Sequence, residues 1–115
     1  MKVIVAGSRN IRSYLSVKNA IENSNFKVDE IVSGHAAGVD SLAELYASRN
    51  NIDMVIFPAN WNKYGKSAGN IRNSKMAEYA DALIAVWDGQ SRGTANMIDI
   101  AKKKGLQIFI YTVKQ

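Results

Sequence analysis

Residues 82–94 read ALIAVWDGQSRGT. The apolar run 82–87 is typical of a strand covered on both faces of a parallel sheet. It ends at Asp88-Gly89, and a loop of glycines and hydroxyls then leads into a segment in which Ala95, Ile98 and Ala101 share one helical face. A strand, a glycine-bearing loop and an amphipathic helix form the repeating unit of α/β proteins, so this stretch predicts that fold class.

The same unit recurs along the chain. Apolar runs are found at 3–6, 30–33, 54–57, 82–87 and 106–111, and helical stripes at 14–21, 39–46, 68–79 and 95–101. Gly105 follows the last stripe, where a glycine ends a helix. The alternation predicts one domain over residues 1–115: a three-layer Rossmann-like sandwich with a five-stranded, mainly parallel sheet and helices on both faces.

Composition excludes several classes of function. The 115 residues contain no cysteine and one histidine, His35, so we expect no disulfide, thiolate chemistry, metal site or cofactor. His35 itself is expected to pack or hydrogen-bond in a loop. There is no apolar run of membrane length and no signal-peptide pattern, so a cytoplasmic protein without a membrane partner is expected.

The net charge is +5, and the basic residues form one continuous run, Lys102-Lys103-Lys104. We interpret that run as the solvated end of a helix, where cations complement the helix dipole.

The loops after the first two strands are rich in glycine. Ligands of open α/β sheets bind outside the carboxyl ends of the strands, and these loops lie there because each follows the end of a strand. The second loop opens into the clearest helical stripe and would present backbone N–H groups to a phosphate, although Asp40 is equally explained as a helix-start carboxylate. The candidate ligand-binding residues of the two loops are Gly7, Ser8, Arg9, Ser33, Gly34, Gly38 and Asp40.

The next two loops carry aromatic and charged side chains. Residues 58–73 are expected to form one long loop, in which aromatic rings stack on a base and cations pair with phosphates; the alternative is a surface loop anchored by a buried Trp61. The loop after the fourth strand again places hydroxyls and glycine before a helix. The candidates here are Trp61, Lys63, Tyr64, Arg72, Asn73, Asp88, Ser91, Arg92, Gly93 and Thr94.

Three motifs resemble one known family. They are Gly34-x-x-x-Gly38-x-Asp40, Trp61-x-Lys63-Tyr64-Gly65-Lys66-x-Ala68-Gly69-x-x-Arg72-Asn73 and Trp87-Asp88-Gly89-x-Ser91-x-Gly93-Thr94. Together they resemble the SLOG superfamily, above all its YspA-like, YpsA-related branch, along nearly the whole chain. The superfamily also contains the Lonely Guy phosphoribohydrolases, the DNA-processing protein DprA and molybdenum-cofactor carriers. The resemblance implies a Rossmann-like domain that binds nucleotides or nucleotide-derived ligands.

One departure bears on catalysis. Lonely Guy enzymes carry a glutamate just after a Gly-Thr pair, whereas here Ala95 follows Gly93-Thr94. Hydrolysis of an N-glycosidic bond needs carboxylates, and the candidates on this end of the sheet are Asp40 and Asp88.

We therefore expect a domain that senses, carries or sequesters a nucleotide-derived signalling molecule. Its glycine loops would hold phosphate with the cations, Trp61 or Tyr64 would cover the base, and Asp40 or Asp88 would contact the ribose. Arg72→Ala is expected to weaken binding with little change in melting temperature.

The alternatives are a nucleoside 5′-monophosphate phosphoribohydrolase and a nucleic-acid-binding module. Nucleic acid is the less favoured partner because the loop cations gather at one end of the sheet; a homo-oligomer is expected.

Overall fold

The computed structural model describes residues 1–114 and contains one five-stranded sheet, in the order β3-β2-β1-β4-β5. Every neighbouring pair is parallel. This confirms the predicted Rossmann-like fold. The strands are β1 Lys2–Gly7, β2 Glu30–Ser33, β3 Asp53–Ile56, β4 Ala82–Trp87 and β5 Gln107–Thr112. The helices are α1 Tyr14–Asn23, α2 Val39–Arg49, α3 Trp61–Tyr64, the 3-10 turn η1 Gly65–Ser67, α4 Ala68–Tyr79 and α5 Arg92–Lys103.

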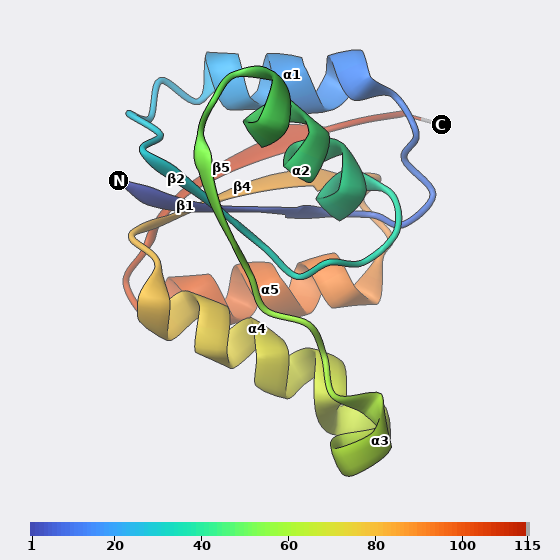
Figure 1. The fold of residues 1–115 in the computed structure, drawn as a ribbon. Helices are drawn as coiled ribbons and strands as arrows, with labels where there is room; N and C mark the ends of the chain where they lie inside the picture. The colour runs from blue at the N-terminus through green and yellow to red at the C-terminus, as the bar shows by residue number, and fades with distance from the viewer. Residues whose placement is uncertain (115) are drawn as a thin grey trace.

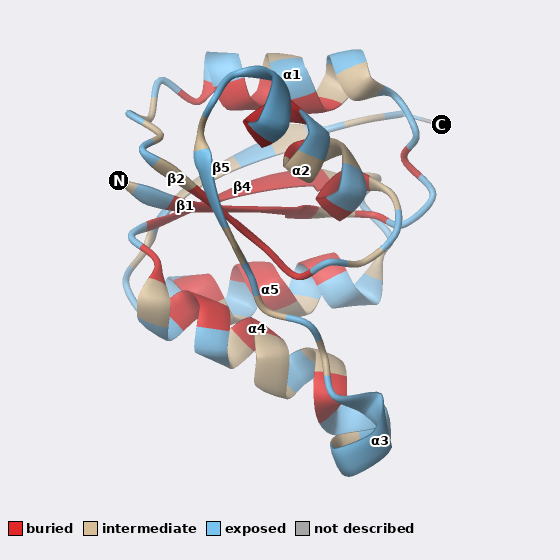
Figure 2. Ribbon diagram, in the orientation of Figure 1, coloured by how far each residue is buried: buried red, intermediate tan, exposed pale blue. Residues whose placement is uncertain are grey.

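Three layers result, with α1 and α2 on one face of the sheet and α4 and α5 on the other (Figure 1). Strand β1 serves both layers because its side chains alternate between the faces. Val3 and Val5 belong to the core under α1 and α2. Ile4 and Ala6 belong to the core over α4 and α5. The central strands and the inward helix faces are accordingly buried in Figure 2.

The chain reverses its direction of travel across the sheet beside β1. It moves outward from β1 through β2 to β3, then returns to place β4 on the other side of β1. In such sheets the loops after β1 and β4 part to opposite faces and leave a crevice between them. The fold thus sets the position of a site at the carboxyl ends of these two strands.

The segment 58–73 differs from the expected single loop. Asn60 starts α3, since its side-chain oxygen accepts a hydrogen bond from the Lys63 N–H at 3.1 Å. Helix α4 begins at Ala68, as the helical stripe over 68–79 predicted, so the expectation of a single loop is wrong for residues 61–73. Amides and glycines that looked like loop residues therefore serve as helix caps and turns. Helix α3 projects beyond the end of α4 (Figure 1), and Trp61 is 51% exposed, not buried as the alternative interpretation required.

The third strand also differs from expectation. Its apolar run suggested a strand covered on both faces, but β3 lies at the edge of the sheet, where Met54 and Ile56 are exposed. The lysine run behaves as interpreted: α5 ends at Lys103, which pairs with Asp99 one turn earlier at 3.1 Å. No helix within residues 1–114 has the length and apolar character that crossing a membrane requires.

Gly7 provides the first test of this fold. A Cβ atom there would overlap the carbonyl oxygen of Val86 and lie 2.7 Å from the Val39 side chain. We expect Gly7→Ala to lower the free energy of unfolding by at least about 3 kcal/mol, because neither backbone nor packed core can yield cheaply. Urea denaturation of the two proteins measures this change in the free energy of unfolding.

Gly93→Ala is the matched control, since a Cβ at Gly93 meets no atom within 4 Å. We expect its stability to equal or slightly exceed that of the unaltered chain, by up to about 1 kcal/mol. Equal stabilities for the two variants would contradict the packing described at Gly7.

Candidate functional site

A cavity of about 590 Å³ lies at the crevice between β1 and β4, and we call it the switch-point cavity. The loops after β1 and β4, the start of α5 and one side of α4 form its walls, with Ala36 and Asp40 entering from the loop after β2 and from α2. Small-molecule sites typically occupy about 300–1,000 Å³. The predicted residues that line it are Gly7, Arg9, Asp40, Trp61, Arg72, Asn73, Asp88, Ser91, Gly93 and Thr94.

Asp40 is the most unusual of these side chains. It is 6% exposed, and its Oδ2 accepts a hydrogen bond from the Ala36 N–H at 3.1 Å. Burial raises the pKa of Asp40 to about 6, against the lowering effects of the Ala36 hydrogen bond and of the Arg72 charge. A carboxyl group that titrates near neutrality is thus held in the cavity wall.

Arg72 links three elements around that carboxyl. Its Nη1 donates to the Gly34 carbonyl at 2.6 Å, and its Nε donates to Asn73 Oδ1 at 2.9 Å. Asn73 in turn donates to Asn96 of α5 at 3.0 Å. Arg72 therefore ties α4 to the loop after β2, so its removal is expected to lower stability, contrary to the sequence-based expectation of an unchanged melting temperature.

Asp88 organises the loop after β4. Its Oδ1 accepts hydrogen bonds from the N–H groups of Gln90 and Ser91, both at 2.8 Å. These bonds hold the pKa of Asp88 below its ordinary value. The Ser91 side chain then starts α5 by accepting from Thr94 N–H and hydroxyl, at 3.4 and 3.1 Å. The pKa values of the two aspartates that line the cavity are thus displaced in opposite directions, down for Asp88 and up for Asp40.

Two glycines allow the loops to meet. Gly38 has φ +75°, and a Cβ there would overlap the Arg9 backbone. A Cβ at Gly34 would lie 2.6 Å from Arg72 Nη1 and 3.0 Å from Asp40 Oδ2. Both glycines therefore permit close packing of protein on protein, and the structure does not bring them to the cavity lining.

Two serines among the predicted residues also lie behind the cavity wall. Ser8 is buried and accepts the Asp88 N–H at 3.2 Å. Ser33 donates to Glu44 at 2.8 Å and accepts the His35 N–H at 3.1 Å. His35 Nδ1 contacts the same carboxylate at 3.0 Å, so the structure shows this histidine as a loop hydrogen-bonding residue.

The remaining predicted residues lie elsewhere. Lys63 and Tyr64 line a second hollow on the α3 side, and Arg92 is exposed outside both linings. Sequence reasoning left several lining residues out of the predicted site. Lys66 and Gly69 are named in the second motif and could have been found there; no motif names the others, which are Ala6, Asn10, Ala36, Asn70, Met76, Gln90 and Met97.

Asp40 gives a prediction about pH. Its pKa is higher in the folded chain than the ordinary 3.8, so the folded state favours the protonated form. The contribution of Asp40 to the free energy of unfolding is therefore greatest below about pH 4. It decreases by about 3 kcal/mol as the pH rises to about 6, and it stays constant at higher pH. In Asp40→Asn, which keeps an acceptor for Ala36, we expect this loss to vanish. Urea unfolding at pH 4 and pH 7 measures it.

The informative quantity is the difference between variant and unaltered chain at each pH, because Asp29 and Asp88, whose pKa values are lowered, contribute the opposite slope to both proteins. A difference that stays constant from pH 4 to pH 7 would contradict the assignment.

Comparison with known proteins supports the fold and the family. The chain is 28% identical to the Gene 61 protein of Mycobacterium phage D29, over 93% of each chain. Its fold matches the X-ray structure of DNA processing protein A (DprA) from Streptococcus pneumoniae with a TM-score of 0.72 and 21% identity. That match covers 95% of this chain but 49% of DprA, so the chain spans about half the length of that structure.

The family model "YspA, cpYpsA-related SLOG family" matches residues 1–64, which is more than half of the 115 residues. The matched part includes β1, β2, Asp40 and α3. The chain belongs to the YspA, cpYpsA-related SLOG family.

Proposed function

We propose that this chain binds a nucleotide or nucleotide-derived ligand in the switch-point cavity. The observation that carries the proposal is the set of charges in the lining. Arg9, Lys66 and Arg72 border the cavity together with the start of α5, where Ser91, Gly93 and Thr94 lie. Cationic side chains and a helix N-terminus together favour a phosphate group.

The remaining lining suits the other parts of a nucleotide. Trp61 lies at the cavity with half of its surface exposed, and an exposed indole offers a stacking surface for a base. Asp40 and Asp88 supply acceptors for hydroxyl groups. Membership of the YspA, cpYpsA-related SLOG family also supports a nucleotide-related ligand.

Binding can be tested at Lys66. This lysine is exposed and borders the cavity, and it makes no hydrogen bond or ion pair with the described residues, so its loss leaves the fold intact. We expect Lys66→Ala to weaken binding of AMP about ten-fold at low ionic strength, the effect of losing one charge-assisted phosphate contact. Isothermal titration calorimetry measures the affinity.

Lys102→Ala is the control, because it removes the same charge from the last turn of α5, at the other end of that helix from Ser91. We expect its AMP affinity to be unchanged. Equal losses in both variants would indicate non-specific attraction, and absence of saturable binding of AMP, ADP and ADP-ribose by the unaltered chain would refute the proposal.

A second candidate function is hydrolysis of the N-glycosidic bond of a nucleotide. It is favoured by the two carboxyl groups of one cavity, whose pKa values are displaced in opposite directions, up for Asp40 and down for Asp88. Such a division suits a general acid and an ionised partner. Asp40 would give its proton to the departing base, Asp88 would take a proton from the attacking water, and the oxygen of that water would bond to C1′ of the ribose as the C1′–N bond breaks.

Liquid chromatography of AMP incubated with the chain tests this activity. We expect adenine and ribose 5-phosphate in equal amounts, and at least about a hundred-fold less in Asp40→Asn, the usual scale of acid–base catalysis. Adenine release that persists in Asp40→Asn would assign it to a contaminant. If the chain binds AMP without releasing adenine, the binding function stands alone.

A further inference from the structure

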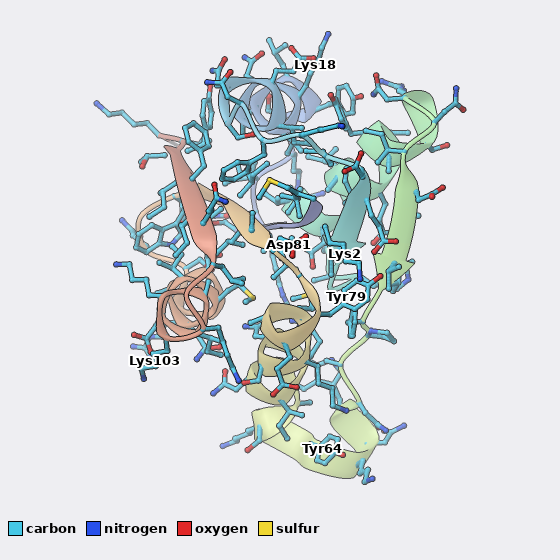
Figure 3. All side chains as sticks on the ribbon, turned by 90° about the vertical axis from the view of Figure 1, so that its left-hand side faces the viewer. Lys2, Lys18, Tyr64, Tyr79, Asp81 and Lys103 are labelled. Atoms are coloured by element: carbon cyan, nitrogen blue, oxygen red, sulfur yellow. The ribbon has the colours of Figure 1, made fainter. Side chains whose placement is uncertain are left out.

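A second hollow adjoins the switch-point cavity. It has a volume of about 610 Å³ and is formed by residues 58–64 together with Lys75 of α4. Trp61 lines both hollows, so they adjoin at this residue. Residues 58–64 belong to the segment that projects beyond α4, and Figure 3 shows Tyr64 at its tip, remote from Lys18 and Lys103.

The charge of this second hollow has one sign. The ammonium groups of Lys63 and Lys75 lie 5.1 and 5.9 Å from the centre of the Tyr64 ring. No aspartate or glutamate occurs between Asp53 and Glu78 in the sequence. Neither lysine has an ion-pair partner among the described residues. Two ammonium groups that share one ring and have no ion-pair partner in the described part of the chain attract an anionic group, such as a phosphate.

The indole between the two hollows is held from one side. Gly69 lies in the first turn of α4, and a Cβ there would be 3.6 Å from the Trp61 ring, so the ring rests against α4 where glycine leaves room. Half of the Trp61 surface remains open. An aromatic ring placed between two cationic hollows matches a base that lies between two phosphates.

We propose that the ligand consists of two consecutive nucleotide units, with one phosphate in the switch-point cavity, a base on Trp61 and the second phosphate between Lys63 and Lys75. This deepens the proposed function and rests on it. Neither Lys63 nor Lys75 lines the switch-point cavity, so a mononucleotide placed there does not reach them. The second hollow therefore selects for length, and the selectivity resides in α3 and α4.

The test compares AMP with the 5′-phosphorylated dinucleotide pApA by calorimetry at low ionic strength. We expect pApA to bind the unaltered chain at least about ten-fold tighter than AMP, since it adds a charge-assisted phosphate contact. In Lys63→Ala/Lys75→Ala, we expect the ratio of the two affinities to fall to about one. Lys18→Ala/Lys102→Ala removes two lysines from α1 and from the far end of α5, and should preserve the ratio.

Each outcome decides one question. Binding of AMP with no preference for pApA overturns this inference and leaves the proposed function standing, whereas binding of neither refutes the proposed function. A preference that survives in Lys63→Ala/Lys75→Ala also overturns the inference. A 5′-phosphorylated 20-mer of deoxyadenylate identifies the source: affinity equal to that of pApA points to a free dinucleotide, and higher affinity with a steep salt dependence points to a single-stranded nucleic acid.

Discussion

The parallel pairing of β1 with β4 is the constraint on which the rest of the molecule depends. It aligns Val3 with Ala82 and Gly7 with Val86, so two segments about eighty residues apart in the sequence finish side by side at the carboxyl end of the sheet. Gly7 makes the last step of that pairing possible, because any side chain there would overlap the Val86 carbonyl. The crevice, the two loops that border it and the start of α5 all follow from this one alignment.

The electrostatics of the cavity arise from the packing of the protein around it. Gly34 and Gly38 let the loop after β2 approach Arg72 and the Arg9 backbone closely. That approach buries Asp40 and raises its pKa, while Arg72 beside it opposes the increase. A ligand phosphate would therefore enter a cavity that already contains a costly carboxyl group, which favours ligands that donate a hydrogen bond or proton to it.

The projecting segment gives this small domain a second surface. Helix α3 and η1 supply Trp61, Lys63 and Lys66, and the structure divides them between the two hollows: Lys66 borders the first, Lys63 borders the second and Trp61 borders both. A polar, cationic segment with an exposed indole is not needed to complete either hydrophobic core. Its conformation is instead held by caps such as Asn60 and by the ring contacts of Tyr64. The proposed selection among ligands therefore resides in a segment that the hydrophobic cores do not constrain.

The sequence by itself determined the fold class, the number of strands and the end of the sheet at which the cavity lies, because hydrophobic periodicity and glycine-bearing loops are local patterns. It also identified Asp40, Arg72, Asp88 and the start of α5 as members of that end. Only the tertiary structure decided which of these side chains face the cavity. The wall is supported from behind by four of the predicted residues, because they contact other segments of the protein. These residues are Gly34, Gly38, Ser8 and Ser33. The short helix α3 and the edge position of β3 were likewise beyond local patterns: caps resemble loop residues, and the order of strands is set by long-range packing.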